Sequence, residues 1–195
     1  MNNFSSWDEI PNPFPQWETN HKKWLSSELS NFTYEEPLAA RKALLTRPHG
    51  QPTTVRFILP HEHKGLDIYK KWNAWKGFTG PQLLDTYKQG NITNVLAEYI
   101  PGKEVHLIND ETLLAERDYW TRQLYTQIRY LHSLEAYISD GLSGGVIIDE
   151  KDNARIIDLG DLAPLSAQNH LQEIAQNYRS IDSLFENTLG EFTKP

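Results

Sequence analysis

The chain of 195 residues is long enough to bury a core, and its hydrophobic content of 38% is typical of folded proteins. It contains no cysteine, which excludes disulfides, zinc–thiolate sites and cysteine nucleophiles. The net charge of −7 is uneven, because residues 1–90 sum to +2 and residues 91–195 to −9. An acidic second half with no Lys/Arg cluster argues against nucleic-acid binding.

Residues 1–25 are predicted to form an extended arm. Residues 1–25 combine Pro11, Pro13 and Pro15 with Trp7 and Trp17, a composition that suits an extended surface segment. A short helix is predicted over residues 24–29. There is no run of 18 apolar residues and no signal-peptide pattern. We therefore expect no membrane span, and either a cytoplasmic protein or an effector secreted by a non-classical route.

The first half of the chain is mostly strand by pattern. The stretch "RKALLTRPHGQPTTVRFILP" predicts two strands around a turn at residues 48–50. The stretch "KGLDIYKKWNAWKGF" has apolar residues at helical spacing and stops at Gly77, so it predicts one helix. Two more strands are predicted in "PQLLDTYKQG" and "ITNVLAEYI".

The second half begins with a long predicted helix, capped at Asn109 or Asp110. Its apolar stripe at helical period consists of Leu113, Trp120, Leu124, Ile128 and Leu131. A β-hairpin follows, with strands "VIID" and "ARIID" around "EKDN", and a second helix is predicted over residues 167–189. The pattern as a whole predicts an α+β fold.

Two aspartates flank the predicted hairpin. Asp140 precedes it and Asp158 follows it, so both carboxylates are expected at the same end of the hairpin. Paired carboxylates suit a divalent cation and a proton acceptor, which phosphoryl transfer requires. On spacing alone, two aspartates that cap and solvate a hairpin are the alternative.

Three segments resemble protein kinases. Residues 130–163, "YLHSLEAYISDGLSGGVIIDEKDNARIIDLGDLA", resemble the catalytic loop, hairpin and D-F-G segment, with Asp140 and Asp158 eighteen residues apart as in the family. "LAEYIPGKE" is similar to the kinase hinge, and "NYRSIDSLFENTL" to the helix whose aspartate anchors the catalytic loop. Because the chain stops soon after that helix, it resembles the minimal kinase-like effectors of pathogenic bacteria, and "RIIDL" is similar to small kinases acting on lipopolysaccharide core heptose.

The resemblance implies a minimal two-lobed kinase-like fold. Residues 26–101 would form an N-lobe with a small antiparallel sheet, and residues 102–195 a reduced, mostly helical C-lobe. ATP and Mg²⁺ would be the cofactors of an active member. The implied roles are catalysis for Asp140, metal binding for Asp158, anchoring for Asp182, and nucleotide binding for Arg56, Glu98, Ile100 and Glu104.

The departures from the kinase pattern bear on activity. Gly145 stands where the family has a metal-binding asparagine, and Leu142 stands where it has a cation two residues after the catalytic aspartate. No glycine-rich loop precedes the first hairpin, where the chain reads "NFTYEEPLAARKALL", and Arg56 stands in place of the phosphate-pairing lysine. Two hypotheses follow: a pseudokinase that binds a protein partner as a regulatory module, or an active ATP–Mg²⁺ kinase acting on a protein or small molecule. The oligomeric state is left open.

Overall fold

The computed structural model describes residues 33–39, 42–46, 52–60, 64–89, 92–142 and 144–190. Within these residues the chain forms three α-helices and ten β-strands, and all the strand pairs are antiparallel. The expected α+β class is therefore confirmed. The predicted arm at residues 1–25 and the short helix at 24–29 lie outside the described residues. The chain divides into two compact units, one with the residues up to His63 together with Gln82–Tyr99, and one with Lys64–Pro81 and the residues from Ile100 onward.

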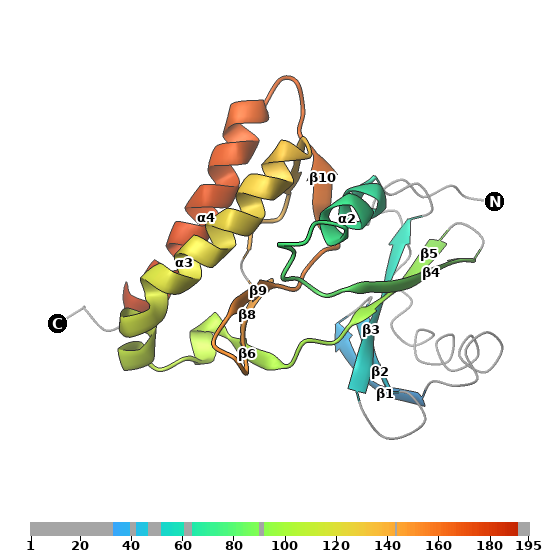
Figure 1. Ribbon diagram of the computed structural model, residues 1–195, viewed down its shortest axis with the longest axis horizontal. Helices are drawn as coiled ribbons and strands as arrows, with labels where there is room; N and C mark the ends of the chain where they lie inside the picture. The colour runs from blue at the N-terminus through green and yellow to red at the C-terminus, as the bar shows by residue number, and fades with distance from the viewer. Residues whose placement is uncertain are drawn as a thin grey trace. The chain divides into compact units, whose positions relative to one another are not determined.

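The first unit contains a five-stranded sheet in the order β1-β2-β3-β5-β4 (Figure 1). The strands are β1 (Thr33–Ala39), β2 (Lys42–Thr46), β3 (Pro52–Pro60), β4 (Leu83–Gln89) and β5 (Ile92–Glu98). The predicted pairs β2–β3 and β4–β5 both form. Strand β5 lies between two neighbours, and its residues 93–97 are all buried. A strand whose two faces are both buried is expected to contain successive apolar residues, and Val95, Leu96 and Ala97 are such residues here.

Strand β1 was not expected from the sequence. It contains Glu35, Glu36 and Pro37, which are depleted in strands, and it lies at the edge of the sheet, paired only with β2 among the described strands. An edge strand tolerates proline and charge because one row of its backbone groups needs no ladder partner. Register shifts on either side of Glu36 and Pro37 show the local irregularity that these residues cause.

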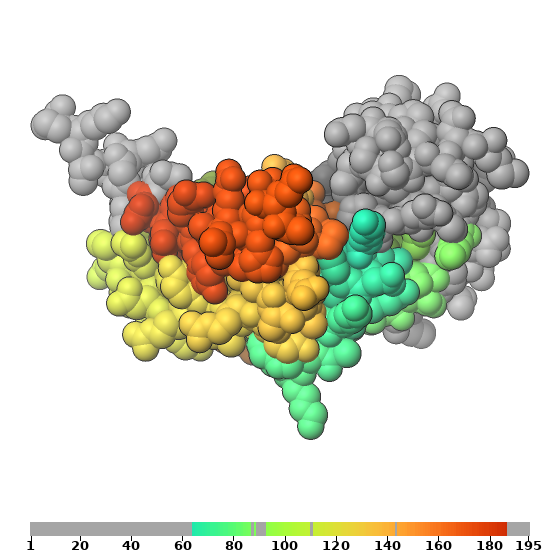
Figure 2. Space-filling model, turned by 90° about the horizontal axis from the view of Figure 1, so that it is seen from above, coloured from blue at the N-terminus to red at the C-terminus, as the bar shows by residue number. Residues whose placement is uncertain are grey.

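The second unit contains the three helices and two small sheets (Figure 1). Its elements are α2 (Gly65–Asn73), β6 (Gly102–Glu104), the 3₁₀ turn η2 (Val105–Leu107), α3 (Asp110–Ser133), β7 (Ala136–Ile138), β8 (Val146–Asp149), β9 (Ala154–Ile156), β10 (Leu162–Pro164) and α4 (His170–Gly190). Helices α3 and α4 lie side by side, and Figure 2 shows α4 in orange-red along one face with α3 in yellow next to it. None of the helices in the described part of the chain is long and apolar enough to cross a membrane.

Helix α3 forms as its sequence predicts. The side chain of Asn109 accepts a hydrogen bond from the Thr112 amide at 2.9 Å, which caps the first turn. All five residues of the predicted stripe are fully buried. Two of its residues outside that stripe also bond inward: Gln127 to the loop after α2, and Gln123 to the amide of Ala154. This helix therefore supports both the core and the hairpin that follows.

Helix α2 belongs to the second compact unit, together with the residues from Ile100 onward. Its residues Tyr69 and Trp72 are buried, and the chain after it is tied to the rest of this unit. Gln127 Nε2 donates to the Gly77 carbonyl at 2.7 Å, and Arg155 Nη1 donates to the Thr79 carbonyl at 3.0 Å. These long-range contacts are side-chain bonds to loop carbonyls, which helical periodicity alone does not predict.

Candidate functional site

The predicted hairpin is present and has a well-bonded turn. Strands β8 and β9 pair with Val146 opposite Ile156, and the turn at residues 149–153 is organised by one carboxylate. Asp149 Oδ1 accepts from the amides of Lys151 and Asn153 at 2.9 Å each, and its Oδ2 accepts from Arg155 Nε at 2.7 Å. Burial alone would raise the pKa of Asp149, but these hydrogen bonds outweigh burial and lower it below its usual value.

Replacing Asp149 by alanine is expected to lower the free energy of unfolding by about 2–3 kcal/mol, because it removes several charge-assisted hydrogen bonds. Since folding lowers the pKa of Asp149, its contribution is fully present above the unfolded-state pKa of about 3.9 and is lost as the pH falls through the folded-state value. Denaturant titrations across this acidic range measure that loss.

The exposed carboxylate of Asp118 provides the control for Asp149. The variant Asp118→Asn should change the free energy of unfolding at neutral pH by less than about 0.5 kcal/mol, and Asp149→Asn should lose part of the wild-type acid dependence. Equal acid dependence in Asp149→Asn and in the wild type would contradict the assigned role of the turn carboxylate.

The segment that carries Asp140 is held by two neighbouring elements. Strand β7 pairs with β10, with Ile138 opposite Leu162, and the amide of Ser139 donates to the Asp161 carbonyl at 2.9 Å. The chain entering Asp140 therefore runs antiparallel to the chain that leaves Asp158. This pairing joins the two motifs that the sequence placed at one end of the hairpin.

The second support of this segment is Asn177 in α4, which is fully buried. Its Oδ1 accepts from the amide of Ile138 at 3.1 Å, and its Nδ2 donates to the carbonyl of the same residue at 2.8 Å. His132 Nε2 lies 3.3 Å from the same Oδ1 and donates to it, because an amide oxygen can only accept. Burial lowers the pKa of His132, while the hydrogen bond with Asn177 opposes that shift.

Asp182, the residue expected to anchor the catalytic loop, lies elsewhere on α4. It is exposed, and its carboxylate accepts a hydrogen bond from the hydroxyl of Tyr125. That hydrogen bond, together with burial and the negative charge, raises the pKa of Tyr125 to about 12. The anchoring contact expected of Asp182 is made by Asn177 instead. Its sequence signal was an amide on the inward face of α4, one turn before the buried Ile181.

Asp158 lies directly beside Gly145. Its Oδ1 accepts from the amide of Gly160 at 3.2 Å, and its own amide lies 3.5 Å from the Gly145 carbonyl. A Cβ built on Gly145 would stand 3.1 Å from the Cβ of Asp158. Position 145 is thus adjacent in space to Asp158, but glycine supplies no side chain there.

Leu142 is turned into the protein. Its side chain is 1% exposed, so the position at which the kinase pattern has a cation is part of the core. A core position of this kind offers no charge to a transferring phosphoryl group. The exposed Asp140 carboxylate is only two residues away.

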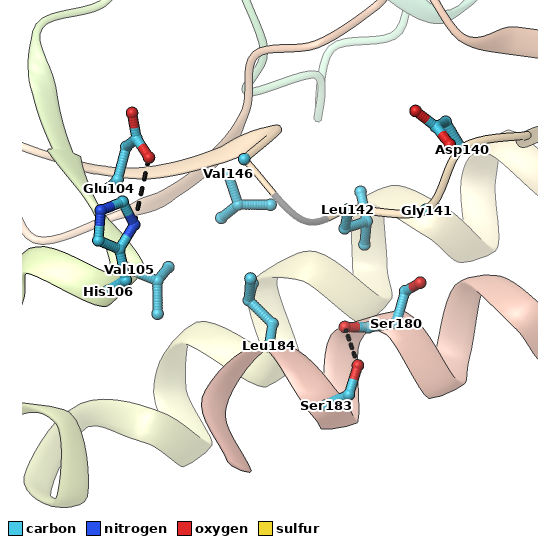
Figure 3. A pocket seen from close by; sticks show the side chains of 11 residues that line it. Glu104, Val105, His106, Asp140, Gly141, Leu142, Val146, Ser180, Ser183 and Leu184 are labelled. Carbon is cyan, nitrogen blue, oxygen red and sulfur yellow. Dashed lines mark hydrogen bonds and ion pairs between the residues drawn. The ribbon is translucent and has the colours of Figure 1, made fainter. Parts of the chain in front are cut away.

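Asp140 and Glu104 line one hollow of the second unit, about 200 Å³ in volume, which we call the Asp140 groove (Figure 3). The groove is lined by Glu104, Val105, His106, Asp140, Gly141, Leu142, Gly144, Val146, Ser180, Ser183 and Leu184. Glu104 lies next to His106, with its Oε2 3.2 Å from the ring Nδ1. Two of the sequence-predicted site residues thus share one cavity.

The remaining predicted nucleotide contacts are distributed over both units. Arg56 lies in β3 with Leu96 as its register partner, and its side chain is outside the described part of the structure. Glu98 ends β5; its amide donates to the Gln82 carbonyl at 2.8 Å, and its carboxylate accepts from the Gln82 amide at 3.3 Å. Ile100 begins the next stretch of the second unit.

The donor set for a metal is small. Asp140 and Asp158 supply carboxylates, which Mg²⁺ uses together with substrate phosphates, but Gly145 adds no oxygen ligand. Among the described residues, no group of three or more His, Asp or Glu side chains could hold a metal ion. The residues therefore fit a magnesium site of the kinase type only in part.

Comparison with known proteins adds no assignment. No protein-family model matches the chain, and no curated protein sequence matches it.

Proposed function

We propose that this chain is a minimal two-lobed kinase-like protein that acts as a pseudokinase, a binding or regulatory module for a protein partner. The observation that carries the proposal is the combination of a firmly held Asp140 loop with a buried Leu142 in the place of the catalytic cation. The hydrogen bonds from Asn177 that hold this loop are present. The buried Leu142, however, stands where the kinase pattern has a cation.

The architecture of each unit supports the kinase-like part of the proposal. One unit is a small antiparallel sheet, and the other is mostly helical, with a hairpin between the two aspartate segments. The pairing of β7 with β10 and the bonds from Asn177 bring these segments together. These features fit the loop, hairpin and helix order that the sequence resemblance implies.

The chemistry supports the pseudokinase part. Phosphoryl transfer depends mostly on positioned charges, and a single cationic contact can be worth about 10³ or more in rate. In this chain the amide ligand is replaced by Gly145, the cation by Leu142, and the glycine-rich loop by the strand β1 with its two glutamates. Each replacement removes charge stabilisation from the transition state.

An active kinase that uses ATP and Mg²⁺ is the second candidate, because Asp140 is exposed in a groove that Glu104 also lines. In that case Asp140 would accept the substrate proton, Asp158 would bind the metal, and Arg56 would contact a phosphate. Arginine presents a planar fork where the family uses a point charge, which makes it a poor replacement at such a site.

The melting temperature in the presence of ATP and Mg²⁺ separates the two candidates. A ligand at 100 times its dissociation constant stabilises the folded state by about 2.7 kcal/mol, which is about 5–10 °C for a chain of this length. The pseudokinase proposal predicts no shift at millimolar ATP with Mg²⁺. A shift of that size, absent with Mg²⁺ alone and weakened in Asp158→Ala, would favour the active kinase.

A further inference from the structure

The Asp140 groove has a carboxylate at each end. Figure 3 shows Glu104 and Asp140 at opposite ends, and both residues are exposed. The described residues that line the groove include no lysine or arginine, so no cation of the chain neutralises these ends from within, apart from His106 when it is protonated. The groove also belongs to the half of the chain whose charge sums to −9. Its field therefore attracts cations and repels phosphate groups.

The middle of the groove is apolar. Val105, Leu142 and Val146 line it and are themselves buried, and Figure 3 shows Leu142 and Val146 between the two acidic ends. Helix α4 adds the hydroxyls of Ser180 and Ser183 along one side. The three buried residues expose only 1–3% of their surface, so the half-buried Leu184 of α4, which Figure 3 also shows between the two ends, is the apolar side chain that a partner could contact.

The volume limits what the groove can hold. Its volume is about 200 Å³. Small-molecule sites usually measure about 300–1,000 Å³, so the groove alone is too small for a nucleotide. A stretch of extended chain laid across it would place one side chain in the middle and its neighbours at the ends.

We propose that the Asp140 groove binds an extended segment of a partner protein in which one apolar side chain lies between two basic ones. Alternate residues of an extended chain point to the same side, so the pattern is basic, any residue, apolar, any residue, basic. The apolar side chain packs against the half-buried Leu184, and the two basic side chains meet Glu104 and Asp140. A carboxylate has about four acceptor positions, so Glu104 can bond a partner while it stays beside His106. This inference rests on the proposed function as a binding module and specifies the partner's chemistry.

The test uses the full chain and a fluorescein-labelled peptide with the core Arg-Ala-Leu-Ala-Arg, followed by fluorescence polarisation. We expect binding that weakens with added salt, because exposed charges are screened. An exposed ion pair contributes modestly to affinity, and reversing a charge adds repulsion, so Glu104→Lys combined with Asp140→Lys should weaken binding by at least about tenfold. The isosteric pair Glu104→Gln and Asp140→Asn, which disturbs folding least, should weaken it by about threefold or more.

The control variant is Glu116→Lys, which reverses an exposed carboxylate on α3 outside the groove. It should bind the peptide within about twofold of the wild type, since a single distant surface charge is largely screened. A peptide with serine in place of leucine should bind about fivefold or more weakly, because the apolar contact is lost.

Several results would overturn the proposal. They are absence of peptide binding, equal binding by the wild type and both double variants, and equal binding of the leucine and serine peptides. Binding of spermidine without peptide binding, lost in the same variants, would replace the peptide with a small polycation. None of these results bears on phosphate transfer, so a failure here is distinct from a failure of the pseudokinase proposal, which is decided with labelled ATP.

Discussion

Replacing Asn177 by alanine is expected to lower the free energy of unfolding by about 2–4 kcal/mol, a large effect for one side chain. The variant leaves the amide and the carbonyl of Ile138 without their partner in a buried strand, and it removes the acceptor of His132. A buried backbone group that loses its hydrogen bond costs about 1–3 kcal/mol, and two such groups are involved here. Chemical denaturation followed by tryptophan fluorescence measures the change.

The matched control for Asn177 is its neighbour Gln176. Gln176 Nε2 donates to the carbonyl of Ser139 at 3.1 Å, but the contact is at the surface, where water can replace it. We expect Gln176→Ala to cost less than about 1 kcal/mol. If Asn177→Ala and Gln176→Ala lower the free energy of unfolding equally, the hydrogen bonds of Asn177 to Ile138 stabilise the fold no more than a surface contact does, which contradicts the prediction.

The second large effect is expected from adding the missing ligand at position 145. A Cβ at Gly145 meets the Cβ of Asp158 at 3.1 Å, so Gly145→Ala and Gly145→Asn should both lose about 1 kcal/mol from the tight contact. Only Gly145→Asn also places a carboxamide oxygen beside the Asp158 carboxylate. If its affinity for magnesium becomes about 1 mM, then about 10 mM Mg²⁺ should stabilise it by about 1.4 kcal/mol.

The comparison between the two variants makes this measurement specific. Because Gly145→Ala carries the same Cβ without the amide, its melting temperature should not respond to Mg²⁺. A response of equal size in Gly145→Ala and Gly145→Asn, or no response in either, would contradict the view that the missing asparagine is what leaves the site incomplete.

The elements with strong periodic patterns were predictable from the sequence. The stripe of α3, its cap at Asn109 and the hairpin of β8 and β9 all form where the pattern indicated them. Each depends on neighbours within a few turns or across a short loop, and so its signal is local. Strand β1 was missed because its position at the sheet edge, which makes Pro37 acceptable, is a property of the assembled sheet.

The site was predictable only in part. The resemblance indicated Asp140 and Glu104, which the structure brings to one groove, and Asp158 and Gly145, which it places side by side. It did not indicate Asn177, because Asp182, about one and a half turns later on α4, is the residue that matches the anchoring aspartate of the kinase motif. Which of the two reaches Ile138 depends on the rotation of α4 about its axis, and the buried Ile181 and Phe185 fix that rotation.

The most direct test of the pseudokinase proposal is incubation of the full chain with γ-labelled ATP and Mg²⁺, alone and with a general protein substrate. The pseudokinase proposal predicts no transfer of label to the chain or to the substrate beyond the level of Asp140→Ala. Transfer that is abolished in Asp140→Ala and retained in the control Glu116→Ala would overturn it, since it would require the loop around Leu142 and Gly145 to be catalytic.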